Sequence, residues 1–395
     1  MRELIKDLWG RLEEGHKSLS HIDWKMFFCA LLLSAAGLVT MNSFLPEGNP
    51  QAQIADHFFG RQSLWIVISV VVFFVAANID WRFLRRTSVI VALFSFSVAL
   101  LLLLFVVGKA VHGAQSWFNL GGFSFQPSDP VKLVLLLLLS KYFSRRHVEI
   151  ANVRHILTSG LYAFILFILV LIQPDFGSAI IIFLIWLGMV LVSGISKRHL
   201  AAVILSVIIG FSVMWSLVLA PYQKQRIVTF INPLTDIHGA GYNAYQSTIA
   251  VGSGEILGKG IGYGTQSKLK FLPEYETDFI FAAFAEEWGF VGVSVIFVLF
   301  GFLISRILKE AMRGGSNFET FFGLGVAIFF MTHLIIHIGM NLGVLPITGT
   351  TLPFMSYGGS HLATEFLALG ILMGMRKYSI ATHKEAIEQE IPGIE

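Results

Sequence analysis

The sequence predicts an all-α polytopic integral membrane protein with about ten transmembrane helices and one long extracellular loop. Only 13% of its 395 residues are charged, whereas soluble domains carry roughly 25%, so lipid must solvate much of the surface. The mean hydropathy of +0.72 agrees with this. The apolar residues also gather into runs of about 17 to 25 residues, which is the length that crosses a bilayer.

Ten such runs follow one another along the chain and are predicted to be spanning helices. Only the residues from Gln173 to Asp175 separate the fifth run from the sixth, which indicates a tight turn at the membrane edge. The predicted spans cover residues 24–45, 62–79, 88–107, 129–143, 155–172, 176–194, 199–219, 279–304, 318–343 and 357–375.

Basic residues decide the predicted orientation. Most of the 28 Lys and Arg residues fall in the N-terminal segment, in alternate loops and after the last span, and such segments stay in the cytoplasm. We therefore expect a single membrane domain over residues 1–395. Its parts would be a cytoplasmic N-terminal segment at 1–23, a long extracellular loop at 220–278 that is ordered and packed, and a cytoplasmic tail at 376–395.

Composition and missing motifs exclude several classes of protein. The formal net charge of +3 comes from short basic clusters between apolar runs, so no nucleic-acid partner is expected. Cys29 is the only cysteine, which excludes an intrachain disulfide. The absence of a Walker loop, a dinucleotide fingerprint and a GxSxG elbow argues against ATP-driven, redox and serine-hydrolase chemistry.

Polar residues open the fourth and sixth spans, and ionisable residues at membrane depth are candidates for function because they are costly there. Asp129 and Lys132 in QPSDPVK are three residues apart, which places them on one helical face where they can pair. That pair can be structural, functional or both. Ser128 or Asp129 is expected to cap the fourth span, and Asp175 in QPDFGSA to cap the sixth.

An acidic segment at 271–292 surrounds the start of the eighth span. Thr277 or Asp278 is expected to cap this helix at the outer surface, so that Asp278 faces the extracellular mouth. Glu286 and Glu287 lie two turns deeper and at different angles around the helix. They are therefore predicted to be buried structural acids.

Two further pairs have more than one interpretation. Lys224 and Arg226 follow the seventh span, and two cations at a membrane mouth suit a phosphate-bearing ligand, although a solvated basic pair at the headgroup level has the same pattern. His333 and His337 have the i, i+4 spacing of zinc ligands, but no third ligand or HExxH acid accompanies them. Polar packing between helices is therefore favoured, and no metal site is expected.

Taken together, these segments resemble the SEDS family (shape, elongation, division and sporulation), in order from the first span to the last. Within that family they are more similar to the rod-elongation branch than to the division branch. The stretches that carry the resemblance are FQPSDPVKL at 125–133, QPDFGSA at 173–179, PYQKQRIVTFINPLTD at 221–236, the segment from GAGYNAY to EEWGFVG at 239–292, and LPITGTTLPFMSYGGS at 345–360.

The resemblance implies a peptidoglycan glycosyltransferase that joins lipid II units into glycan strands at the outer face of the bacterial cytoplasmic (inner) membrane. It places the family's essential aspartate on Asp278 and the lysine of its QPSExxK motif on Lys132. It also implies a partner, a class B penicillin-binding transpeptidase. A divalent cation is the one cofactor left open.

Three positions depart from the family pattern. Asp129 replaces a glutamate and is one methylene shorter, which puts its reach to its lysine partner in question. Ser116 stands where an arginine usually precedes the tryptophan, here Trp117, so a phosphate contact is expected to be missing. Glu276 replaces a histidine and adds negative charge beside Asp278.

Transfer of a sugar from a diphospho-lipid requires a base for the acceptor hydroxyl and cations for the departing diphosphate. Asp278 is the predicted base, and Lys132, Lys224 and Arg226 are the predicted diphosphate partners in an inverting displacement. Apolar outer walls would take the lipid tails. The main alternative is a lipid II flippase, which is disfavoured because no charged chain crosses the bilayer midplane. A scaffold that only anchors a partner enzyme would not need these groups.

Overall fold

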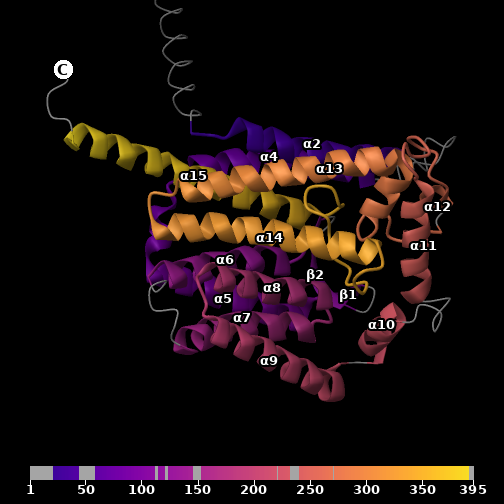
Figure 1. The fold of residues 1–395 in the computed structure, drawn as a ribbon, viewed down its shortest axis with the longest axis horizontal. Coiled ribbons are helices and arrows are strands. Elements are labelled where there is room, and N and C mark those ends of the chain that lie inside the picture. The colour runs from indigo at the N-terminus through magenta and orange to yellow at the C-terminus, as the bar shows by residue number, and fades with distance from the viewer. Residues whose placement is uncertain are drawn as a thin grey trace, which may run out of the picture.

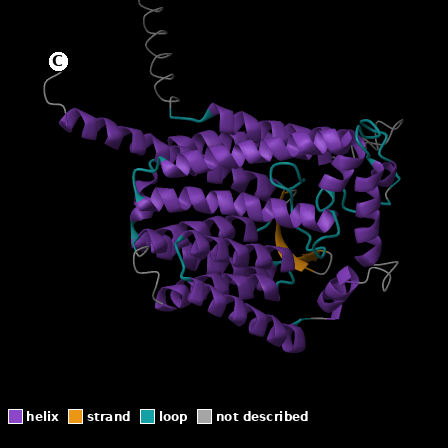
Figure 2. Ribbon diagram, in the orientation of Figure 1, coloured by secondary structure: helices purple, strands orange, loops and turns teal. Residues whose placement is uncertain are grey.

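The computed structural model describes residues 21–43, 58–111, 114–120, 123–145, 153–219, 221–231, 240–269 and 271–390. Within them the chain is helical apart from one small sheet and the connecting turns (Figures 1 and 2). The elements are α2 (Trp24–Ser43), α4 (Phe58–Asn78), η1 (Trp81–Arg85), α5 (Thr87–Val107), β1 (Lys109–Val111), β2 (Ala114–Leu120), β3 (Phe123–Phe125), α6 (Ser128–Ser144), α7 (Val153–Ile172), α8 (Phe176–Val192), α9 (Lys197–Val213), η3 (Met214–Val218), α10 (Pro221–Ile231), α11 (Ala240–Ser253), α12 (Thr265–Lys268), α13 (Ile280–Met312), α14 (Asn317–Asn341) and α15 (Gly359–Glu390).

Every apolar run predicted from the sequence coincides with a helix, which confirms the all-α membrane fold. Among the described helices, seven are long and apolar enough to cross a membrane, and α8 is a shorter apolar helix. The other two, α6 and α15, carry several ionisable residues. The total of about ten spans therefore stays a prediction.

Two helices extend past the ends predicted from hydropathy. α13 continues to Met312 instead of ending near residue 304, and α15 continues to Glu390 instead of residue 375. The residues that follow each apolar run are rich in Ala, Leu, Lys and Glu, which are strong helix formers. Backbone hydrogen bonding therefore continues where hydropathy falls, and each helix extends beyond its predicted span.

A small antiparallel sheet interrupts the helical pattern between α5 and α6. Its strand order is β1-β2-β3, with Phe118 opposite Phe125. The Ser116 hydroxyl on β2 donates to the Gln173 carbonyl at 3.3 Å, which ties the sheet to the turn between α7 and α8. Hydropathy did not predict this sheet, since its strands are far shorter than a membrane span.

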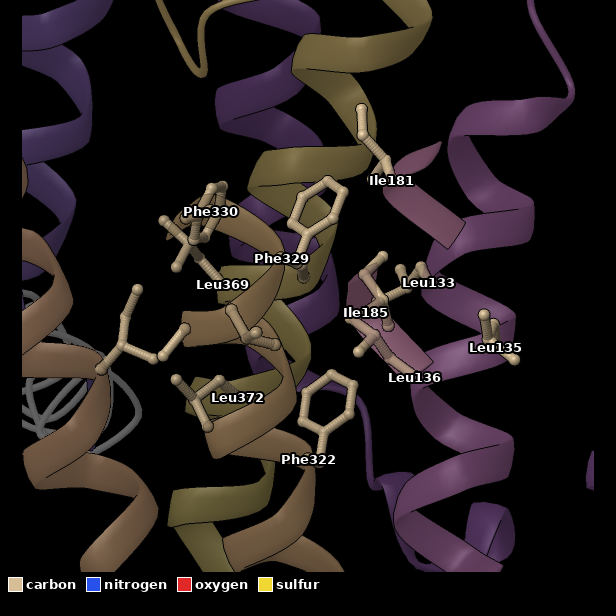
Figure 3. Packing of buried hydrophobic residues seen from close by; sticks show 14 of the residues in the cluster. Leu133, Leu135, Leu136, Ile181, Ile185, Phe322, Phe329, Phe330, Leu369 and Leu372 are labelled. Carbon is tan, nitrogen blue, oxygen red and sulfur yellow. The ribbon is translucent and has the colours of Figure 1, made fainter. Parts of the chain in front are cut away.

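α6 lies at the centre of the bundle and packs against α5, α7, α8, α14 and α15. Figure 3 shows its side chains facing those of the neighbouring helices. Leu135, Leu136 and Leu139 are fully buried, whereas Val203 is the one buried residue of α9. Lipid therefore solvates α9 on most sides and α6 on almost none. The polar residues at the start of α6 consequently lie inside protein.

One end of the bundle carries the sheet together with α10, α11 and α12 (Figure 1). These three helices belong to the predicted loop at 220–278, of which residues 221–231, 240–269 and 271–278 are described. α10 packs against α11, and α11 packs against α12, α13 and α14. The segment is thus folded onto the ends of two long helices, while its location outside the cell stays a prediction.

α13 is interrupted near its first third at Gly289, whose φ is +63°. The break exposes two carbonyl groups, which accept hydrogen bonds from the segment before α12. The Glu286 carbonyl accepts from the Lys259 N–H at 3.0 Å, and the Glu287 carbonyl accepts from the Gly260 N–H at 3.0 Å. This segment therefore docks into the break in the helix.

The break predicts a strict requirement for glycine. A Cβ added to Gly289 would lie 2.2 Å from the Gly258 nitrogen, and a positive φ is strained for alanine. We expect Gly289→Ala to lower the free energy of unfolding by at least roughly 1–3 kcal/mol and to expose residues 254–268 to protease. Thermal unfolding in detergent and limited proteolysis measure both effects.

Gly301→Ala is the matched control on the same helix, because nothing lies within 4 Å of a Cβ added there. It should unfold at the wild-type temperature or slightly above, since alanine is the better helix former. Equal melting temperatures for the two variants would refute the packing argument.

Candidate functional site

Asp278 lies in the turn before α13, at the end of the bundle that carries α11 and α12. Its N–H donates to the Glu274 carbonyl at 3.1 Å, and its own carbonyl accepts from Asn341 Nδ2 at 3.0 Å. A Cβ added to Gly349 would lie 3.3 Å from Asp278 Oδ2, so the carboxylate faces residues 342–358, the α14–α15 loop. The half-exposed side chain is therefore held between two ordered segments.

The prediction that Thr277 or Asp278 caps α13 is wrong. α13 begins at Ile280 without a side-chain cap from a residue close in sequence. Instead, the Ala282 N–H donates to Asn341 Oδ1 at 3.2 Å. The end of α14 thus satisfies an amide that the first turn of α13 leaves unpaired. No local sequence motif predicts this cap.

The α14–α15 loop also holds the backbone just ahead of that aspartate. The Ser356 hydroxyl donates to the Thr277 carbonyl at 2.7 Å. The Tyr357 N–H donates to the Glu276 carbonyl at 2.8 Å. Two hydrogen bonds to main-chain carbonyls therefore join the turn to the loop.

His333 and His337 pin the same loop to α14. His337 Nδ1 donates to the Thr350 carbonyl at 2.7 Å, and His333 Nδ1 donates to the Thr351 carbonyl at 3.3 Å. Both rings are buried. The two histidines thus have polar partners, as predicted, but these lie in a loop and not on a second helix. Within the ranges that the structure describes, no group of His, Cys, Asp and Glu has the arrangement of a metal site.

Asp129 and Lys132 form the ion pair that their spacing predicts. Lys132 Nζ lies 3.1 Å from Asp129 Oδ1, and the two side chains are only 3% and 4% exposed. The shorter aspartate therefore reaches its lysine partner. Its second oxygen, Oδ2, accepts from the Ser360 hydroxyl at 3.0 Å, which joins α6 to α15.

Two ionisable residues beside this pair escaped the sequence interpretation. His361 Nδ1 lies 3.4 Å from Asp129 Oδ1, and His361 Nε2 lies 2.9 Å from Glu365 Oε1. Glu365 Oε2 accepts from the Phe354 N–H at 2.8 Å. The signal was present, since a His and a Glu four residues apart within an apolar span are candidates for function.

Asp175 caps α8, as predicted, with Oδ1 accepting from the Ser178 N–H at 3.0 Å. Its Oδ2 accepts from Gln126 Nε2 at 2.9 Å and from the Ser128 hydroxyl at 3.4 Å. α6 has no side-chain cap, so the prediction that Ser128 or Asp129 caps it is wrong. Both side chains bond to other helices instead, and α6 and α8 begin side by side.

Glu286 and Glu287 are buried, as predicted, and their partners lie in residues 259–266. Glu286 Oε1 accepts from Lys259 Nζ at 2.7 Å and from the Gln266 N–H at 3.1 Å. Glu287 Oε1 accepts from the Gly262 N–H at 2.7 Å. The two acids therefore anchor α12 and the segment before it onto α13.

Three predicted site residues remain to be placed. Lys224 is half-exposed on α10, and α10 packs against α11. The side chain of Arg226 lies outside the described residues. Trp117 is half-buried on β2. The ligand roles of these three residues stay predictions.

The family of FtsW, RodA and SpoVE, described as cell cycle proteins, matches residues 23–381, and the chain belongs to this family. FtsW of Haemophilus influenzae, named a probable peptidoglycan glycosyltransferase, is 34% identical over 89% of each chain. Stage V sporulation protein E of Bacillus subtilis is 34% identical over 90% of this chain and 97% of its own length. MrdB of Escherichia coli K12, named a peptidoglycan glycosyltransferase, is 36% identical over 76% of this chain and 79% of its own.

Solved structures show the same fold. A chain of a peptidoglycan synthase complex, described as coordinating polymerization and crosslinking, has a TM-score of 0.75 and 29% identity over 90% of this chain and 98% of its own. RodA of Thermus thermophilus has a TM-score of 0.65 and 28% identity over 90% and 96%. The resemblance to the SEDS family is thus confirmed. The rod-elongation branch stays a prediction, because FtsW, SpoVE and RodA-type proteins all match.

The buried ion pair predicts a double-mutant effect on stability. Asp129→Asn or Lys132→Met alone leaves an uncompensated charge and should lower the free energy of unfolding by roughly 3–5 kcal/mol. The double variant removes both charges and should recover most of that loss. Thermal unfolding of the purified proteins in detergent measures this, and a double variant as unstable as the worse single one would contradict it.

Proposed function

We propose that this chain is a peptidoglycan glycosyltransferase that polymerises lipid II into glycan strands for cell-wall elongation, with Asp278 as its catalytic base. One observation carries the proposal. In a member of this family, a half-exposed carboxylate lies just before a long helix, on a turn whose main-chain carbonyls accept hydrogen bonds from α14 and from the α14–α15 loop. A fixed and accessible carboxylate is what general-base catalysis requires.

The proposed reaction is a single displacement at the anomeric carbon of the donor sugar. Asp278 takes the proton from the acceptor hydroxyl as its oxygen attacks the face opposite the leaving group. The bond to undecaprenyl diphosphate breaks, and the configuration inverts. Lys132, Lys224 and Arg226 are the proposed cations that stabilise the charge developing on the diphosphate.

Lys132 supports this assignment through its position. It lies inside protein and is held by Asp129 at 3.1 Å, so its charge is fixed in a poorly solvated place where electrostatic stabilisation is strong. The Asp129→Asn/Lys132→Met protein should therefore fold but fail to polymerise lipid II. Full activity in that protein would remove Lys132 from the proposed site.

We further propose that the chain lies in the bacterial inner membrane with both termini in the cytoplasm, as one domain over residues 1–395. Its exposed apolar helix faces would hold the lipid tails of the substrates. A class B penicillin-binding transpeptidase is the proposed partner. The similarity to a chain of a synthase complex that coordinates polymerization and crosslinking supports this.

A lipid II flippase is the alternative from a different class, and the names of the relatives disfavour it. A flippase has no need for a proton acceptor at Asp278. The decisive measurement is therefore strand formation from purified lipid II by the purified protein, with and without the partner and with and without a divalent cation.

Asp278→Asn is expected to lower polymerisation by roughly 10²- to 10⁴-fold, the usual effect of losing a general base. Folding should survive, because asparagine has the same size and the side chain is half-exposed. Lipid II binding should change little, since the proposed cations lie elsewhere. Strand formation per folded protein is the measurement.

Glu274→Gln is the matched control, since it removes a second exposed carboxylate from the same turn. Glutamine can still accept the hydrogen bond from Thr277 Oγ1 that Glu274 Oε2 accepts at 3.3 Å. Its activity should stay near that of the wild type. Near-normal product from Asp278→Asn would reject Asp278 as the base.

The proposed orientation predicts opposite labelling at the two ends of α13. Tyr263, near its start, is 73% exposed, and Met312, at its end, is 76% exposed, whereas Cys29 is buried. A membrane-impermeant maleimide should label Tyr263→Cys in intact spheroplasts. It should label Met312→Cys only after permeabilisation, and the reverse pattern would invert the topology.

A further inference from the structure

Four ionisable side chains form a buried row at the start of α6 and α15, and the proposed reaction uses only the first. They are Lys132, Asp129, His361 and Glu365, in that order. The distances between neighbours are 3.1 Å, 3.4 Å and 2.9 Å, and no side chain is more than 5% exposed. Such a costly row in the interior calls for an explanation.

The charges in this row can balance one another. Asp129 accepts from Lys132 and from Ser360, which pairs one cation with one anion. His361 lies within ion-pair distance of both Asp129 and Glu365. The row has no net charge when His361 and Glu365 are either both charged or both neutral, and neutrality is the condition for burying it.

Glu365 also joins the row to the α14–α15 loop. Its second oxygen accepts from the Phe354 N–H at 2.8 Å. Phe354 is buried and has a φ of +62°, a strained conformation for this residue. Strain of this kind persists only where the surroundings hold it, and here the Glu365 carboxylate is one of the groups that does so.

The same loop then reaches the Asp278 turn. Ser356 lies two residues after Phe354, and its hydroxyl donates to the Thr277 carbonyl at 2.7 Å. A continuous chain of contacts thus runs from the Lys132 ammonium through Asp129, His361 and Glu365 to the loop, and from the loop to the turn.

We propose that His361 and Glu365 are positioning residues of the polymerase. They hold the leaving-group cation Lys132 and the base Asp278 in one fixed geometry, by linking α6 to the α14–α15 loop. This inference rests on the proposed function and deepens it. Neither residue touches the reacting atoms; each acts through a neighbour.

The link depends on side-chain length and on one donor and one acceptor, not on charge. In Glu365→Gln the amide oxygen can accept from the Phe354 N–H while the amide nitrogen donates to His361 Nε2. In Glu365→Asp the charge remains, but the side chain is one methylene too short to reach both partners. The two variants therefore separate positioning from simple charge balance.

The test compares strand formation from lipid II per folded protein. Glu365→Gln should stay within about threefold of the wild type, because both of its contacts are kept. Glu365→Asp should lower kcat roughly 10- to 100-fold, which is the usual effect of small misplacements of catalytic groups, with a smaller change in KM for lipid II. Equal activities, or a more active aspartate variant, would overturn the proposal.

His361 provides a second, independent comparison if Glu365→Asp does not fold. His361→Gln retains a donor and an acceptor, whereas His361→Phe retains only the shape, and His361→Phe with Glu365→Leu makes the pair apolar. The apolar pair is expected to fold, since a buried polar pair can be replaced by apolar groups of similar size, but to polymerise poorly. Restored activity in the apolar pair would show a purely structural role and overturn the proposal.

The proposed function is tested separately in the same assay. A wild-type protein that makes no strands, or a fully active Asp278→Asn variant, contradicts the function itself. An active wild type with an inactive Asp278→Asn variant, together with equal Glu365 variants, contradicts only the positioning role.

Discussion

The buried carboxylate of Asp129 is the constraint around which this end of the bundle is arranged. A charge in the interior of a membrane protein persists only when partners neutralise and hydrogen-bond it. Asp129 obtains a lysine from its own helix and a serine and a histidine from α15. These partners bring α6 and α15 together at one end, and Asp175 brings α8 beside them through Gln126 and Ser128. Three helices thus converge at this end because their polar groups find hydrogen-bond partners there and would find none in lipid.

The α14–α15 loop obeys the same physics. Irregular backbone near membrane depth is tolerated only where protein groups satisfy its amides and carbonyls. His333 and His337 donate to two of its carbonyls, and Glu365 accepts from one of its amides. A loop bonded in this way is rigid enough to hold its neighbours. The turn that carries Asp278 is hydrogen-bonded to this loop. The bonds that satisfy the loop's backbone therefore also fix the position of the Asp278 carboxylate.

The other side of the Asp278 turn is fixed by different means. The break at Gly289 opens carbonyls in α13, and the segment before α12 docks there, held also by Glu286 and Glu287. α11 completes this end by packing on α13 and α14. The candidate base therefore stands between two ordered supports. A polymerase acts on flexible lipid-linked sugars, which are not held in a reactive geometry before they bind. A rigid position for the catalytic base therefore helps each bond-forming step.

Features that depend on neighbours along the chain were predictable from the amino-acid sequence. The bilayer imposes the length of an apolar run, so the helices and the membrane fold were predictable, and short spacings predicted the Asp129–Lys132 pair and the Asp175 cap. The remaining contacts join residues that are far apart in the chain. Asn341 caps α13 from 59 residues away, and Ser360 reaches Asp129 across 231 residues. Such partners depend on how helices pack, which no local pattern encodes. For the same reason Ser128 and Asp278, with the chemistry of capping residues, have other partners, and the link from His361 and Glu365 to Lys132 is visible only in the fold.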